Sequence, residues 1–147
     1  MFKQIKQLFS SIDQQDYDIE QHDLKTAVAA LLIEVMRADN DLQADEQQTL
    51  SLTLKKYFDL TDEAVDELTE QASLSLDDAI DYFQFSKQIN NQCSAQQRIE
   101  IVELLWRLAY SDGELDPQEE YVIRRVANLL YVTHEDFIAA KLAATKL

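Results

Sequence analysis

The chain contains one glycine and one proline among its 147 residues, and this scarcity limits the folds open to it. Tight β-hairpin turns need residues with positive φ, which glycine supplies most readily, so sandwiches and barrels are disfavoured. Glycine-rich phosphate-binding loops are excluded outright. Hydrophobic residues make up 46% of the chain, enough for a core, and the length suits one domain. We therefore expect a single all-α domain over residues 1–147, a compact bundle of about seven or eight helices.

The charge balance narrows the classes of partner. Asp and Glu number 28 against 13 Lys and Arg, which gives a net charge of −15. Nucleic-acid affinity depends on basic side chains that neutralise phosphates, so DNA, RNA and anionic lipid are poor partners. A divalent cation or a basic protein surface remains suitable.

Cysteine usage and apolar runs bear on the compartment. The single cysteine, Cys93, has no partner for an internal disulfide and no CxxC neighbour, which fits a reducing cytoplasm. The longest apolar run, Ala27 to Ile33, is far shorter than the roughly 18 residues needed to span a bilayer. Lysine and glutamine interrupt the N-terminal residues too often for a signal-peptide core. We expect a cytoplasmic protein with no transmembrane segment.

Apolar spacing and capping residues predict the helices. Residues 1–20 read as a short amphipathic helix and a polar connection, and this helix is expected to pack on its own domain rather than on a membrane. A longer helix follows from about residue 20 to Ala38. Four oxygen-bearing side chains are predicted to begin further helices, and the motif SAQQ at the third of them is a capping box. They are Thr61, Ser75, Ser94 and Thr133.

An internal repeat is present. Shifted by 73 positions, LLIEVMRADNDLQADEQQTLSLTLKKYF falls on LLWRLAYSDGELDPQEEYVIRRVANLLY, and after a one-residue adjustment Thr61 meets Thr133. Each unit reads as a helix, an acidic turn, a helix and the start of a third helix. We expect two halves, at about residues 24–73 and 94–143.

The acidic turns contain the clearest backbone signals. In the second copy Gly113 can end a helix in the left-handed conformation, and the run from Asp116 to Glu119 reads as N-cap, N1, N2 and N3. In the first copy Asn40 stands where Gly113 stands, and asparagine also tolerates this conformation. The two turns are therefore expected to share a backbone.

The pair ADNDLQADE and SDGELDPQEE, followed in the second copy by VTHEDF, resembles the TerB-like tellurite-resistance family, which is related to the amino-terminal domain of the co-chaperone DjlA. The resemblance covers about residues 24 to 142. It implies a compact helical bundle, a cytoplasmic bacterial protein and binding of a divalent cation (calcium, magnesium, manganese or zinc) by the acids of the turns. Copy one departs from copy two at Asn40 and Gln43, which makes it the weaker site. The implied metal residues are Asp39, Asp41, Glu46, Asp112, Glu114 and Glu119.

The residues themselves leave two interpretations of these acids open. Hard cations prefer several carboxylate oxygens, and the three predicted acids of each turn lie within eight residues. The loop is not an EF-hand, because position 6 falls on Ala44 or Pro117 instead of glycine. Alternatively the aspartates accept amides inside the turns, while Glu46 and Glu119 favour the positive ends of their helices, each worth roughly 0.3–1 kcal/mol.

Enzymatic chemistry has little support. The two histidines, His22 and His134, lack the i, i+4 partner of zinc-binding helices, and Cys93 has no histidine nearby in sequence. We expect a non-enzymatic module that binds a divalent cation and acts in stress-response assemblies. The alternative is a metal-independent protein-interaction or co-chaperone-like domain whose acidic surface binds a basic partner; a homodimer is compatible with either.

Glu34 and Arg107 occupy equivalent repeat positions and are candidates for an ion pair between the halves.

Overall fold

A computed structural model of the chain describes residues 19–36, 44–58, 60–78, 83–110 and 117–145, and within these ranges it contains seven α-helices and no strand. The prediction of an all-α fold is confirmed. The predicted N-terminal helix lies outside the described residues. The helices are α2 (Ile19–Met36), α3 (Ala44–Phe58), α4 (Asp62–Asp78), α5 (Phe83–Gln92), α6 (Ala95–Ala109), α7 (Pro117–Leu129) and α8 (His134–Thr145).

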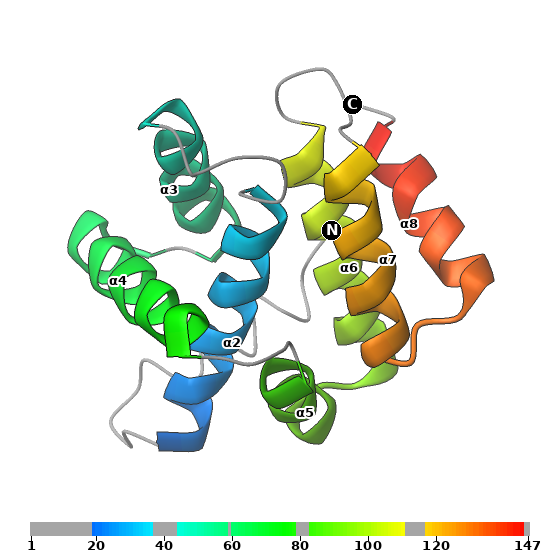
Figure 1. Cartoon of the computed structure of the whole chain (residues 1–147), viewed down its shortest axis with the longest axis horizontal. Coiled ribbons are helices and arrows are strands. Elements are labelled where there is room, and N and C mark those ends of the chain that lie inside the picture. The colour runs from blue at the N-terminus through cyan, green and yellow to red at the C-terminus, as the bar shows by residue number, and fades with distance from the viewer. Residues whose placement is uncertain (1–18, 37–43, 59, 79–82, 111–116, 146–147) are drawn as a thin grey trace.

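Helix α2 is the central element of the bundle. Every side chain from Ala27 to Ile33 is at most 2% exposed. A helix that is apolar on all sides must be covered on all sides, and α2 contacts each helix from α3 to α7. In Figure 1, α3 and α4 lie on one side of α2, and α6, α7 and α8 lie on the other. None of the helices in the described ranges is both long and apolar enough to cross a bilayer.

The helix boundaries follow the sequence repeat. In the described residues, α2 and α3 lie on the first copy of the repeat, and α6 and α7 lie on the second. Helices α4 and α8 begin 72 positions apart. The main packing is also repeated, because α2 packs most extensively on α4, and α6 on α8.

Three of the four predicted helix starts are confirmed by their capping bonds. The hydroxyl of Thr61 accepts the backbone N–H of Ala64 at 3.1 Å, and that of Thr133 accepts Asp136 N–H at 3.2 Å. Ser94 and Gln97 form the reciprocal capping box, with Ser94 N–H donating to Gln97 Oε1 at 2.7 Å. Each of these side chains satisfies an amide that has no partner inside the helix.

The predicted helix start at Ser75 is wrong. Ser75 lies inside α4, which continues to Asp78. The apolar stripe of α4 runs through Val65, Leu68 and Ala72 without a helix breaker, so packing against α2 keeps the chain helical past the serine. The next helix, α5, begins at Phe83 instead.

Candidate functional site

The two acidic turns connect equivalent helices, α2 to α3 and α6 to α7. Helix α2 contacts α7, and the repeat-related pair of α6 and α3 is also in contact. Figure 1 shows that the C-terminal ends of α2 and α6 point to the same end of the bundle. The last described turns of the two central helices therefore lie at the same end.

Most of the predicted metal residues lie outside the described residues. Asp39, Asp41, Asp112 and Glu114 belong to this group. Glu119 lies in the first turn of α7, where a carboxylate favours the positive helix end, whereas the side chain of Glu46 lies outside the described part of the chain. In the part of the chain that the structure describes, no cluster of three or more His, Cys, Asp or Glu residues could hold a metal ion. The metal set as a whole therefore stays a prediction.

An aromatic cluster lies where α6 ends, just before the second turn. The backbone N–H of Tyr110 donates to the carbonyl of Trp106 at 3.0 Å and extends the helix by one residue. The Trp106 ring is fully buried, with its centroid 6.1 Å from that of Tyr110 and 5.1 Å from that of Phe137 in α8. Such ring pairs add roughly 0.5–1.5 kcal/mol beyond the area that they bury. The end of α6 is thereby fixed against α8.

A charged network continues from this cluster to the start of α7. Glu120 Oε1 lies 3.4 Å from Lys141 Nζ and 3.7 Å from an Arg124 nitrogen. The same two cations lie over aromatic rings, Lys141 at 5.2 Å from the Trp106 centroid and Arg124 at 5.3 Å from that of Phe137. The Glu120 carboxylate therefore balances two cations and joins α7 to α8, which gives it a structural role beside the turn.

The family model described as Tellurite resistance protein TerB matches residues 25–142, which is most of the chain. The chain belongs to the TerB family. A search of curated proteins and a search of solved structures found no match. The TerB match spans both acidic turns and ends within α8, so it covers both halves of the repeat.

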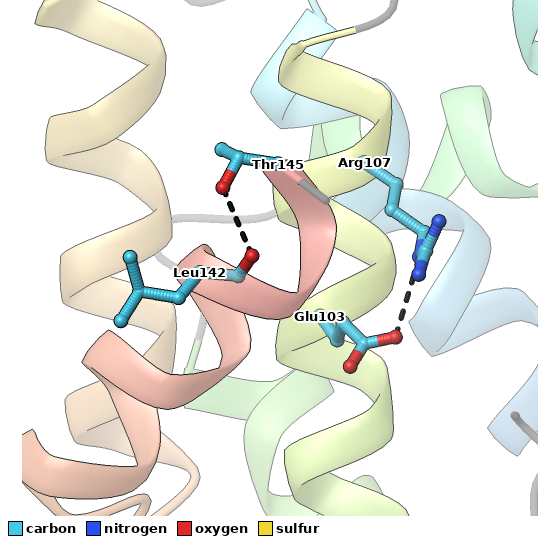
Figure 2. A network of polar contacts seen from close by, with 4 residues as sticks. All are labelled: Glu103, Arg107, Leu142 and Thr145. Carbon is cyan, nitrogen blue, oxygen red and sulfur yellow. Dashed lines mark hydrogen bonds and ion pairs between the residues drawn. The ribbon is translucent and has the colours of Figure 1, made fainter. Parts of the chain in front are cut away.

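The TerB bundle also contains a buried ion pair that the sequence analysis did not single out. Figure 2 shows the Arg107 guanidinium reaching along α6 to Glu103, with Nε 3.3 Å from Oε2. The two side chains are 5% and 15% exposed. The i, i+4 spacing of opposite charges inside an apolar helix is the signal that would have found the pair. The predicted ion pair of Arg107 with Glu34, which is half-buried, stays a prediction.

The structure also describes two further candidate residues, Cys93 and His134. Cys93 is buried between α5 and α6, and burial raises the pKa of its thiol to about 11, against a smaller lowering by the nearby Arg98. The thiol is therefore protonated at neutral pH, contrary to the activation that a helix N-terminus can provide. His134 is exposed at the start of α8, with its ring centroid 6.2 Å from that of Phe137.

Proposed function

We propose that this TerB-family chain is a non-enzymatic cytoplasmic module that binds a divalent cation in its acidic turns and acts in stress-response assemblies. The observation that carries the proposal is that the C-terminal ends of α2 and α6, which precede the two turns in the sequence, point to the same end of the bundle. Carboxylates from two turns at one end of a chain of net charge −15 repel one another, and a hard cation relieves that repulsion.

Cation binding would restrict the angle between the two halves of the repeat. Glu119 lies in the first turn of α7 next to Glu120, whose partners Lys141 and Arg124 pack on the aromatic cluster at the end of α6. An ion held by Asp112, Glu114 and Glu119 would fix the end of α6 relative to the start of α7, and this network would carry the restraint to α8. Protection against tellurite would then be indirect, because tellurite is an oxyanion that a surface of this charge repels.

Titration of calcium, magnesium, manganese and zinc into chelator-treated protein tests the proposal. The readouts are the melting temperature and the fluorescence of Trp106, the only tryptophan. At a free-ion concentration of 100 times Kd, binding stabilises the fold by about 2.7 kcal/mol. The double variant Asp112→Asn, Glu119→Gln should weaken the response, whereas the control Glu135→Gln, an exposed acid in the first turn of α8, should not. No response to any of the four ions would contradict the proposal.

A second candidate function is a metal-independent interaction through α4. Seven of its seventeen residues are Asp or Glu, and none is Lys or Arg. Four exposed acids form one stripe that we call the α4 outer face, namely Glu63, Asp66, Glu67 and Glu70. Like charges at i, i+4 destabilise a helix by roughly 0.2–0.5 kcal/mol per pair, and a basic partner would relieve this.

Binding of an arginine-rich helical peptide distinguishes the two functions. The α4 interaction predicts salt-sensitive binding that the Asp112→Asn, Glu119→Gln variant retains and a Glu67→Lys, Glu70→Lys variant loses. Equal binding by wild type and the α4 variant would contradict a role for this face.

A further inference from the structure

Exposed apolar and basic side chains gather on one side of α7 and α8. The two helices run antiparallel in Figure 1 and are joined by the contact of Glu120 with Lys141. In antiparallel neighbours, the residue that follows each contacting residue turns by about 100° to the same side. Tyr121 and Leu142 therefore lie on one side of the helix pair, where they are 58% and 55% exposed.

Three more exposed residues belong to this surface by the same helical geometry. We call the whole set the α7–α8 outer face, which comprises Tyr121, Arg124, Arg125, Ile138 and Leu142. Arg125 Nη1 donates to the Tyr121 hydroxyl at 3.4 Å, so the guanidinium is held beside the exposed ring. Tyrosine and arginine beside aliphatic side chains are typical of the well-packed centres of protein interfaces.

The repeat-related helix of the other half has the opposite character. Shifted by 72 positions, Asp66, Glu67 and Glu70 of α4 fall on Ile138, Ala139 and Leu142 of α8, whereas Glu63 falls on Glu135 and only this position keeps its charge. One edge of the bundle thus carries a stripe of acids, and the equivalent edge carries apolar residues flanked by two arginines. Figure 1 places α4 and α8 at opposite edges of the molecule.

We propose that the α4 outer face of one copy docks on the α7–α8 outer face of the next copy. Charge complementarity carries the proposal, since carboxylates at Glu67 and Glu70 meet guanidinium groups that bind carboxylates bidentately. Leu74, exposed on α4 just beyond the acids, supplies an apolar contact for Leu142. Because the two faces differ and lie at opposite edges, the contact is heterologous and extends head to tail.

The overall charge of −15 opposes any self-association. The ionic strength determines whether this repulsion or the attraction between the two faces is larger. At physiological ionic strength the Debye length is about 8 Å, so repulsion between distant acids is screened while charges in direct contact still attract. We expect association at high protein concentration that weakens as salt rises toward about 1 M, where the screening length is about 3 Å. The inference names a partner for the α4 outer face, so it rests on the second candidate function; it does not depend on the cation.

Sedimentation velocity over a concentration series tests the inference with two variants, each altered on one face. Arg125→Gln with Leu142→Gln disrupts the α7–α8 outer face without adding acids that could attract lysines, and Glu67→Lys with Glu70→Lys disrupts the α4 outer face. Each variant alone should sediment as a monomer, whereas an equimolar mixture should form dimers and nothing larger, because each partner contributes one intact face. Lys87→Glu, an exposed charge reversal on α5, is the matched control and should associate as wild type does. Circular dichroism checks that all variants keep their helix content.

Three outcomes would overturn the inference. These are a wild-type chain that stays monomeric at every concentration, a single-face variant that still associates alone, and a mixture of the two variants that does not dimerise. If wild type stays monomeric and still binds the arginine-rich peptide through α4, the second candidate function stands and only the self-association is wrong.

Discussion

Helices α4 and α8 occupy equivalent places in the two halves, yet only their inner faces are alike. The buried residues of α4 are Val65, Leu68 and Ala72, and the positions 72 residues later are Phe137, Ala140 and Ala144, which are also buried. The outer faces diverge from acids on α4 to apolar residues on α8. Packing against the central helices therefore requires the same inner pattern twice, while the solvent-facing side can differ between halves and take different partners.

The central helices differ in a similar way. Helix α2 is uncharged from Ala27 to Ile33, whereas the equivalent stretch of α6 contains Glu103, which pairs with Arg107 at the position equivalent to Glu34. An apolar helix is stable wherever its side chains fill the available volume. A buried ion pair is stable only where the two charged groups are in contact. We expect the second half to be the more sensitive to single substitutions within its central helix.

The largest expected effect tests whether the two central helices are packed equally well. Leu32 and Leu105 are repeat equivalents, and both are fully buried. Leu32→Ala and Leu105→Ala should each lower the free energy of unfolding by about 3–4 kcal/mol, because each leaves a cavity in a close-packed core. Urea denaturation measures both. A cost below about 1 kcal/mol for either variant would show that the equivalent sites are not equally packed.

The buried ion pair gives the next effect. Arg107→Ala should cost about 3 kcal/mol, since it leaves the Glu103 carboxylate buried without this cation. Arg124→Ala, at a half-exposed ion pair in α7, should cost about 1 kcal/mol or less. The double variant Glu103→Leu, Arg107→Leu should regain much of the loss, because well-packed apolar residues often replace a buried pair at little cost. If Arg107→Ala and Arg124→Ala lowered the free energy of unfolding by the same amount, the buried and the half-exposed ion pairs would contribute equally, contrary to this expectation.

The third comparison concerns the starts of α4 and α8. Thr61→Ala and Thr133→Ala each remove a hydroxyl that accepts a first-turn amide, at 3.1 Å and 3.2 Å, and each should cost about 1 kcal/mol. Thermal unfolding measures the two losses. Serine at either position should restore stability, because it keeps the hydroxyl; an alanine variant as stable as wild type would mean that the cap contributes nothing there.

The smallest effect is a gain in stability. Tyr131 follows α7 with φ of 58°, and the bonds of Val132 N–H to Ala127 O and of Tyr131 N–H to Asn128 O form a Schellman motif around it. Its ring is 76% exposed, so little packing offsets the left-handed backbone. Tyr131→Gly should therefore raise stability by about 0.5–1 kcal/mol. A loss of stability would indicate a contact of the Tyr131 ring that its exposure does not suggest.

Local signals predicted those features that depend on a few neighbouring residues. Thr61, Ser94 and Thr133 begin helices because each is preceded by a residue outside the helical conformation, and Pro117 is the first residue of α7, a place that its fixed φ favours. Ser75 offers the same side chain, but the residues before it stay helical because Val65, Leu68 and Ala72 pack on α2. The packing of α4 on α2 therefore keeps Ser75 inside a helix, although its side chain alone favours a helix start.

The sequence predicts less about the candidate site, because the geometry of the site also depends on how distant segments pack. The repeat places Glu46 and Glu119 in equivalent first turns, and the helix boundaries agree with that placement. Whether the carboxylates of a turn meet around an ion depends on the backbone of that turn, which no local pattern specifies. The Glu103–Arg107 pair was overlooked because charges in an apolar helix are usually placed at its solvent-facing side, whereas both faces of α6 are covered here.

Calorimetric titration of the cation into three chelator-treated proteins tests the central claim most directly. The proteins are the wild type, a first-turn variant Asp39→Asn, Glu46→Gln, and a second-turn variant Asp112→Asn, Glu119→Gln. The account predicts binding heat in the wild type and a larger loss of affinity in the second-turn variant, because Asn40 and Gln43 make the first turn the weaker site. Absence of heat in the wild type, or the same affinity in all three proteins, would contradict it.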